Sequence, residues 1–194
     1  MSVEAVHTHG VETDDDAMPD PLQLFFALSE RLHDYRVEFI DRETRVSPPP
    51  DGDHETLIWR LARQLARFDV GDRFDAAMNK GVQTPAGDRV VPDITVTASG
   101  AMRGAESWMP SDGVLLVVEV TSTVPGRDRF TKRQVHAEAA IPLYLLIDRS
   151  ESKLTLFTEP EKGNYTGRVE VGFGKLLPVP DPFGFVLDTA SIVD

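Results

Sequence analysis

The segment Val114–Ser122 constrains the fold of this chain more strongly than any other. It is an almost unbroken run of apolar residues, and such runs are typical of strands that are covered on both faces of a sheet. One acid, Glu119, interrupts the run. Burying a carboxylate there costs free energy unless it is paired, hydrogen-bonded or bound to a cation. The sequence therefore predicts a partner or a cation beside this strand.

A second acid raises the same question upstream. Asp93 follows a proline near the start of the predicted strand Val90–Thr97. Downstream of Glu119, the sequence predicts a basic helix over Arg127–Ala140 and a further core strand over Pro142–Asp148. Two acids on neighbouring strands, followed by a basic helix, are the components of a metal-dependent phosphodiesterase site.

The remaining segments predict helices and strands around this centre. Asp20 and Pro21 carry the signals of a helix start, and the apolar spacing continues to about His33. A second helix, capped by Asp53, extends to Phe68. The other expected strands are Arg36–Ile40, Glu43–Val46, Arg73–Lys80, Gln83–Thr84, Lys153–Thr158, Tyr165–Val171, Lys175–Pro178 and Phe183–Leu187, with a loop over Ser99–Asp112. This order predicts one α/β domain with a central mixed sheet, flanking helices and an antiparallel C-terminal extension.

Composition limits the classes of function. The chain has 194 residues, enough for one domain with a sizeable core, which we place at residues 20–194 after a disordered acidic leader at residues 1–19. The sequence contains no cysteine, which excludes disulfides, thiolate metal sites and thiol catalysis. No apolar run is long enough to cross a bilayer, so we expect no membrane association and a cytoplasmic location.

The net charge of −12 argues against extensive contact with nucleic-acid phosphates. Residues 1–20 carry six of the 32 acids and no Lys or Arg, so they account for half of this charge. The rest of the chain has 26 acids against 20 bases and is only mildly acidic. The charge therefore weakens the case for a nucleic-acid substrate without excluding it.

The two acids suit a hard divalent cation. Mg²⁺ or Mn²⁺ prefers carboxylate and carbonyl oxygens and keeps waters and substrate phosphates as further ligands. Asp93, Glu119 and the backbone carbonyl of Val120 are candidate ligands. Such a cation polarises a phosphate and lowers the pKa of an attacking water, while a nearby lysine orients that water or balances charge in the transition state.

Several motifs resemble one protein family. The elements PD, VVEVTS, RDRFTKR and IPLYLLID, in this order and spacing, resemble the Uma-two family of restriction-endonuclease-like proteins in the PD-(D/E)XK nuclease superfamily. The segment VEFIDRETRVSPPPDGDHETLIWRLARQL is similar to the family's acidic hairpin, proline loop and helix that begins with histidine. The resemblance covers about residues 22–188. It implies a restriction-endonuclease-like fold, Mg²⁺ or Mn²⁺ as cofactor and DNA as the nucleic-acid partner; by analogy with enzymes that cut both strands, we also expect a homodimer.

The resemblance also implies roles for individual residues. Asp93 matches the first metal-binding acid and Glu119 the second. The superfamily usually places a lysine two residues after the second acid, where this chain has Thr121. In the Uma-two pattern the lysine lies on the following helix, and Lys132 matches it. Glu38 matches an acid that some members use as an additional ligand or to hold water.

The helix that carries the lysine has further points of interest. Asp128 precedes Lys132 by four residues and is expected to share its helix face, which makes it an accessory candidate. His136 and Ala140 stand where the resemblance leads us to expect Tyr and Gly. We interpret these two departures as changes in helix packing more than in chemistry.

Each candidate also has a structural interpretation, which the sequence leaves open. Thr121 and His54 are accessory candidates for substrate contact, but they also fit a strand end and a helix start. The other candidates have structural interpretations too. Asp93 fits a turn, Glu119 fits an ion pair, and Asp128 with Lys132 fits an exposed pair on a helix. Glu38 fits a position that faces solvent, and Trp108 fits a core contact in place of base stacking.

Three functions are compatible with the sequence. The first is a Mg²⁺- or Mn²⁺-dependent endonuclease that hydrolyses DNA phosphodiester bonds with an activated water. The second is a catalytically silent module that keeps the nuclease fold to bind a partner or nucleic acid, and a fixed Arg or Lys that neutralises Glu119 would favour it. The third is a hydrolase of a small phosphorylated or nucleotide substrate, in a pocket lined by Phe74, Trp108 and Tyr144.

Overall fold

The central sheet has six strands in the order β11-β10-β9-β8-β6-β3. The computed structural model describes residues 20–121 and 126–193, so the predicted leader at residues 1–19 lies outside the described part of the chain. β8 and β9 run parallel and the other four neighbouring pairs are antiparallel, which confirms the predicted mixed sheet. The strands are β3 (Phe74–Met78), β6 (Ile94–Ala98), β8 (Val114–Val120), β9 (Leu143–Asp148), β10 (Lys153–Glu161) and β11 (Asn164–Gly172).

A second sheet has five shorter strands in the order β2-β1-β5-β4-β7. β4 and β7 are parallel, and the other neighbouring pairs are antiparallel. A separate hairpin, β12-β13, forms the antiparallel C-terminal extension. These strands are β1 (Arg36–Ile40), β2 (Glu43–Ser47), β4 (Gly81–Gln83), β5 (Arg89–Val90), β7 (Trp108–Pro110), β12 (Leu176–Val179) and β13 (Phe185–Asp188).

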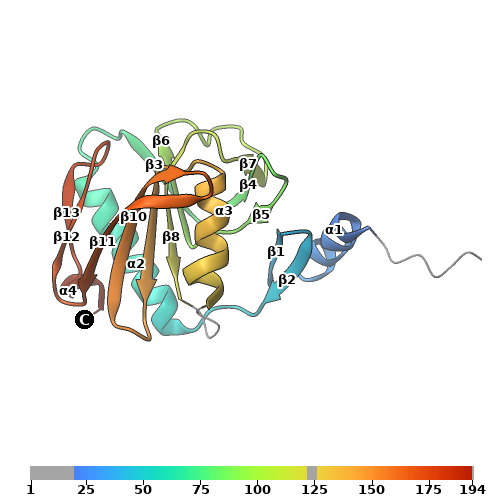
Figure 1. Cartoon of the computed structure of the whole chain (residues 1–194), viewed down its shortest axis with the longest axis horizontal. Coiled ribbons are helices and arrows are strands. Elements are labelled where there is room, and N and C mark those ends of the chain that lie inside the picture. The colour runs from blue at the N-terminus through green and yellow to red at the C-terminus, as the bar shows by residue number, and fades with distance from the viewer. Residues whose placement is uncertain (1–19, 122–125, 194) are drawn as a thin grey trace, which may run out of the picture.

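Two helices cover opposite faces of the central sheet. Val118 of β8 belongs to an apolar cluster with helix α2 (Gly52–Phe68), whereas its neighbour Val117 belongs to a cluster that includes α3 (Arg133–Glu138). Figure 1 shows the two helices on either side of these strands. Because side chains alternate along a strand, Glu119 lies on the face that α3 covers. The fold therefore points this acid toward the predicted basic helix.

The strand predicted over Val90–Thr97 is divided into β5 and β6. Pro92 has no N–H to donate to a ladder, so a strand ends before it. The two parts join different sheets, because β5 pairs with β1 and β4 whereas β6 pairs with β8 and β3. Asp93 therefore stands where the chain passes from the second sheet into the central one.

The helix predicted over Arg127–Ala140 has two parts. Residues Arg127–Lys132 form a π-helical segment, η1, and α3 continues from it. π-helical turns are rare and frequently occur at functional sites. Beyond α3, Ala140 has a φ of +54°, in the left-handed region that favours glycine. The backbone thus explains why the resemblance leads us to expect Gly there.

Other helices differ from expectation at their ends. α1 spans Pro21–Arg31 and therefore ends before His33, while α4 (Ala190–Val193) has no clear signal in the sequence. The cap of α2 is Asp51 rather than Asp53, since the Asp51 side chain accepts a hydrogen bond from a backbone N–H in the first turn. No helix among the described residues has the length and apolarity needed to cross a membrane.

The predicted loop Ser99–Asp112 contains the short strand β7. Its three residues pair in parallel with β4, which is distant in the sequence. A three-residue strand that ends in proline has no periodicity of its own, so the sequence alone does not reveal it. The pairing places Trp108 against Phe25 of α1, with ring centroids 5.6 Å apart, and confirms its core contact.

The left-handed Ala140 leads to a test of the fold. We expect Ala140→Gly to raise the free energy of unfolding by about 0.5–1 kcal/mol, because relief of backbone strain exceeds the added entropy of the unfolded chain. Urea denaturation measures this change. Ala139→Gly, within the helix end at a φ of −76°, is the control and should destabilise. Destabilisation by both substitutions would contradict the conformation assigned to Ala140.

Candidate active site

Three predicted residues from three different elements meet at one point. The Lys132 Nζ lies 3.0 Å from Oε2 of Glu119 and 3.1 Å from Oε1 of Glu38. All three side chains are at most 3% exposed. Glu38 comes from β1 of the second sheet, Glu119 from β8 of the central sheet and Lys132 from η1. Glu38 therefore does not face solvent, and Lys132 is not part of an exposed helix pair.

Asp93 lies next to this group and has its own set of partners. Its Oδ1 accepts a hydrogen bond of 2.8 Å from Arg36, and its Oδ2 accepts one of 2.8 Å from the backbone N–H of Val120. The Nε2 of His54 is 3.2 Å from the same Oδ2. Asp93 is 1% exposed, so it does more than start a turn. It connects β1, β8 and α2 at the edge of the site.

Strand register explains why the two acids are close. Ile94 of β6 pairs with Val118 of β8, and continuing this antiparallel register brings Asp93 opposite Glu119. The motifs PD and VVEV are therefore adjacent in space although the two acids are 26 positions apart in the sequence. Asp93 directly precedes β6, and its carboxylate reaches Arg36 of β1 and His54 of α2.

Burial and charge shift the ionisation of these groups in different directions. Burial raises the pKa of Glu119 well above its ordinary value; the Lys132 ammonium opposes this shift, and the neighbouring carboxylates add to it. Burial alone would also raise the pKa of Asp93, but His54 and the Arg36 guanidinium outweigh it and hold that pKa below its usual range. For Lys132, burial favours the neutral amine, yet Glu119 and Glu38 outweigh burial and raise its pKa. Lys132 is therefore a fixed positive charge at neutral pH.

A cavity of about 300 Å³ opens onto the group. Glu38, Glu119 and Lys132 line it, together with Val120, while Asp93 is absent from its wall among the described residues. The wall carries four acids against three Lys or Arg side chains: Glu38, Asp51, Glu119 and Asp128 against Arg36, Lys132 and Arg149. Counted as formal charges, the wall thus has one more acid than Lys or Arg side chains.

A larger hollow of about 460 Å³ adjoins this cavity. The two share Arg36 and the proline wall at residues 48–50, and Trp108 lines the larger one. Phe74 packs against Phe183 elsewhere, and Tyr144 is fully buried in the core. The described structure therefore does not bring Phe74, Trp108 and Tyr144 together as one aromatic pocket.

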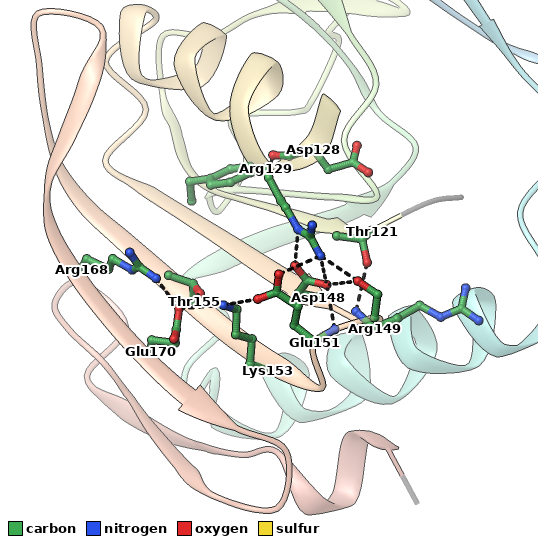
Figure 2. A network of polar contacts seen from close by, with 12 residues as sticks. Thr121, Asp128, Arg129, Asp148, Arg149, Glu151, Lys153, Thr155, Arg168 and Glu170 are labelled. Atoms are coloured by element: carbon green, nitrogen blue, oxygen red, sulfur yellow. Dashed lines mark hydrogen bonds and ion pairs between the residues drawn. The ribbon is translucent and has the colours of Figure 1, made fainter. Parts of the chain in front are cut away.

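The accessory candidates occupy structural positions around the site. The Thr121 hydroxyl accepts a 3.0 Å hydrogen bond from the backbone N–H of Arg149, which ties the end of β8 to the end of β9 (Figure 2). Asp128 is 5% exposed, and its backbone carbonyl accepts a 2.7 Å hydrogen bond from the Tyr144 hydroxyl. His54 lies in the first turn of α2, as the helix-start interpretation expects, and its Nε2 also reaches Asp93; its contact with substrate stays a prediction.

An ion-pair network that the sequence did not indicate anchors η1. Arg129 donates from Nε and Nη2 to the two carboxylate oxygens of Asp148, at 2.5 and 2.9 Å (Figure 2). Glu151 also pairs with Arg129 and with Lys153, which extends the network to β10. A two-pronged arginine–carboxylate contact fixes orientation as well as distance. Lys132 lies three residues after Arg129 in η1, so the contact of Arg129 with Asp148 also holds Lys132 in position.

Arg36 and His136 are further members of the site that the motifs did not single out. Arg36 is two residues before Glu38 on β1, so alternation places both on one face of the strand, and this spacing could have revealed it. His136 is one helical turn after Lys132, and its Nε2 lies 3.6 Å from Oε1 of Glu119. Burial, with a smaller contribution from Lys132, lowers the pKa of His136 to about 3. Its imidazole is therefore neutral at physiological pH.

The residues present are compatible with a hard cation, although they do not form a complete cage. Within residues 20–121 and 126–193, no group of three or more His, Asp or Glu side chains is arranged to hold a metal. However, Oε1 of Glu119 is buried without a hydrogen-bond partner among the described residues. Buried carboxylate oxygens that lack partners are costly and suit a divalent cation.

A family model described as Putative restriction endonuclease matches residues 22–190. The chain belongs to the Uma2 family. This confirms the resemblance to the Uma-two proteins, and the match spans most of the sequence, including all of the residues that meet at the cavity. The comparison with curated proteins found no match.

A solved structure has the same fold as this Uma2 protein. It is described as a putative nuclease belonging to DUF820 from Anabaena variabilis. The superposition has a TM-score of 0.64 and covers 81% of this chain and 89% of that chain, with 17% sequence identity. At this identity the likeness confirms the fold, whereas the chemistry has to be argued from the side chains at the site.

The buried lysine leads to a test of the site's energetics. We expect Lys132→Met to lower the free energy of unfolding by about 3–5 kcal/mol, because Glu38 and Glu119 would be left buried without their cation. Adding Glu119→Gln should recover part of this loss, since the two residues are coupled. Urea denaturation of the single and double variants measures the coupling. Strictly additive effects would contradict the contact.

The lowered pKa of Asp93 predicts an acid-sensitive contribution to stability. Its ion pair contributes in full above the ordinary carboxyl pKa, about 3.9, and the contribution is lost as pH falls toward the lower folded-state pKa. Asp93→Asn should therefore destabilise the protein more at pH 7 than at pH 3, as measured by urea denaturation. Equal destabilisation at both pH values would show that the carboxylate is not held ionised by its partners.

Proposed function

We propose that this Uma2 protein is a Mg²⁺- or Mn²⁺-dependent endonuclease that hydrolyses DNA phosphodiester bonds. The observation that carries the proposal is the convergence of Lys132 on Glu119 and Glu38 inside a cavity, beside Asp93. Burying several charges at the end of a cavity is costly for a fold that needs only stability. Perturbed ionisable groups of this kind cluster at functional sites.

The charge balance of the cavity supports a cation as part of the site. A phosphodiester entering it would meet an excess of carboxylates over Lys and Arg side chains. Asp93, Glu119 and the carbonyl of Val120 are the candidate ligands, with Glu38 as an additional acid. When bound there, a divalent metal supplies a polarised phosphate and a water of lowered pKa.

The protein's own cations have separate roles in this proposal. Lys132 lies at the end of the cavity, where its ammonium holds the attacking water in place or balances negative charge on the phosphorus oxygens. Arg36 holds Asp93 in its ionised form and also lines the cavity. The Arg129–Asp148 contact keeps η1, and with it Lys132, in position.

A second candidate function rests on the same lysine. Lys132 already neutralises Glu38 and Glu119, and a fixed lysine beside Glu119 is the feature expected of a catalytically silent nuclease fold that binds a partner or nucleic acid. The two functions differ in one measurable property. An enzyme takes up a metal at Asp93 and Glu119, whereas a silent module does not need one.

Metal titration separates these two functions. Calorimetry with Mn²⁺ and Mg²⁺ should detect one discrete site in the wild-type protein, and Asp93→Asn or Glu119→Gln should abolish it. A variant with Asp14, Asp15 and Asp16 changed to Asn controls for nonspecific binding by the acidic N-terminal segment and should keep the site. Binding that is absent, or unaffected by both site substitutions, would favour the silent module.

Cleavage of DNA is the second test. Supercoiled plasmid should be nicked or linearised in the presence of Mn²⁺ or Mg²⁺, and chelation should stop the reaction. Lys132→Met should reduce the rate by about 100-fold or more, within the range that one general acid–base or electrostatic group contributes. Arg103→Met, in a loop away from the cavity, is a matched control and should cleave at the wild-type rate. Metal binding without any cleavage of DNA would exclude the proposed reaction.

A further inference from the structure

His136 is where this chain departs from the tyrosine expected by the family resemblance. The residue is 0% exposed and lies on α3, one turn after Lys132. Its ring packs at 5.4 Å from the ring of Tyr144, and its Nε2 lies 3.6 Å from Oε1 of Glu119. A histidine enclosed in this way faces the acid at the centre of the candidate active site.

The two facing atoms both lack a hydrogen-bond partner in the described structure. Among the described residues, both Nε2 of His136 and Oε1 of Glu119 are buried without a hydrogen-bond partner. The other oxygen of Glu119 is already occupied by Lys132. Buried polar groups nearly always have partners, and each that lacks one destabilises the fold. A contact between these two atoms satisfies both at once, and the second lone pair of Oε1 stays available to a cation.

The chemistry of the two groups is complementary. A neutral imidazole carries one N–H, on either ring nitrogen, and a carboxylate oxygen accepts. Hydrogen bonds between such groups are about 2.7–3.2 Å long, so a small rotation of either side chain is enough to close the 3.6 Å separation. The nitrogen that faces Glu119 is then the protonated one.

We infer that His136 is a positioning residue, whose Nε2–H donates to Oε1 of Glu119 and fixes the carboxylate with Oε2 toward Lys132. With a separate partner on each oxygen, the carboxylate can exchange its two oxygens by rotation only if both hydrogen bonds break. The hydrogen bond does not depend on the proposed function. Its effect on metal binding, through the orientation of Glu119, rests on that function. The inference revises the interpretation of His136 as a change in packing.

The same inference explains why histidine can replace tyrosine. Both side chains are planar and largely apolar, and both present a single donor when neutral. An O–H donor is exchanged for an N–H donor, so the acid keeps its partner. Phenylalanine has a similar ring and no donor, which makes it the informative substitution.

The tautomer of His136 tests the hydrogen bond directly. Long-range ¹H–¹⁵N correlation spectra of the full-length protein, labelled with ¹⁵N-histidine, distinguish the protonated ring nitrogen from the bare one. The chain has five histidines, and loss of a signal in His136→Gln assigns this one. We expect the Nε2–H form at pH 7. A bare Nε2, which would mean that Glu119 donates instead, would overturn the inference.

Metal affinity tests whether the contact positions Glu119. Loss of a group that orients a metal ligand typically lowers affinity 10–100-fold. We therefore expect His136→Phe to weaken Mn²⁺ binding by at least 10-fold in calorimetry, and His136→Tyr to restore it to within about 3-fold of the wild-type value. Equal affinities for Phe and Tyr variants that are folded by circular dichroism would overturn the positioning role.

The two measurements fail in different ways. If the wild-type protein binds no metal, the proposed function fails, while the tautomer still decides whether His136 donates to Glu119. If the metal binds and the tautomer is the Nδ1–H form, the proposed function stands and this inference is wrong.

Discussion

The ammonium group of Lys132 is the charge around which the rest of the site is organised. It compensates two buried glutamates that belong to different sheets, and it is delivered by a helix that packs on the central sheet. Without it, Glu38 and Glu119 would be brought together, nearly buried, with no cation in contact with either carboxylate in the described structure, which is costly. The anchoring of η1 by Arg129 and Asp148, outside the cavity, is therefore as relevant to the site as the residues within it.

The site combines stability and chemistry in the same contacts. Asp93 is held ionised by His54 and Arg36, whereas burial favours the neutral form of Glu119. Two carboxylates with opposite tendencies, a permanently charged lysine and a neutral histidine lie close together at the candidate site. pKa shifts in opposite directions are typical of sites in which two acids have different roles. They also mean that removing any one member disturbs the ionisation of the others.

The sequence predicted the elements that have a strong local signal. The apolar run around Glu119 identified β8 and its burial, and the order of motifs identified the family and placed Asp93, Lys132 and Glu38. The sequence did not identify contacts between residues of elements that are distant along the chain. The Arg129–Asp148 contact joins η1 to the end of β9, and β7 forms only because β4 is beside it. His136 was visible at helical spacing from Lys132, but its significance required the position of Glu119 Oε1.

Pro92 lies between β5 and β6, where the chain passes from the second sheet to the central sheet. The acids at the start of β6 and on β8 lie next to Ile94 and Val118, which pair in the central sheet. The proline wall at residues 48–50 belongs to the segment that follows β2, on the other sheet. Insertions or substitutions in that segment can reshape the entrance of the cavity while the two acids keep their separation. The shape of the cavity can therefore change without a change in the strands that carry the two acids.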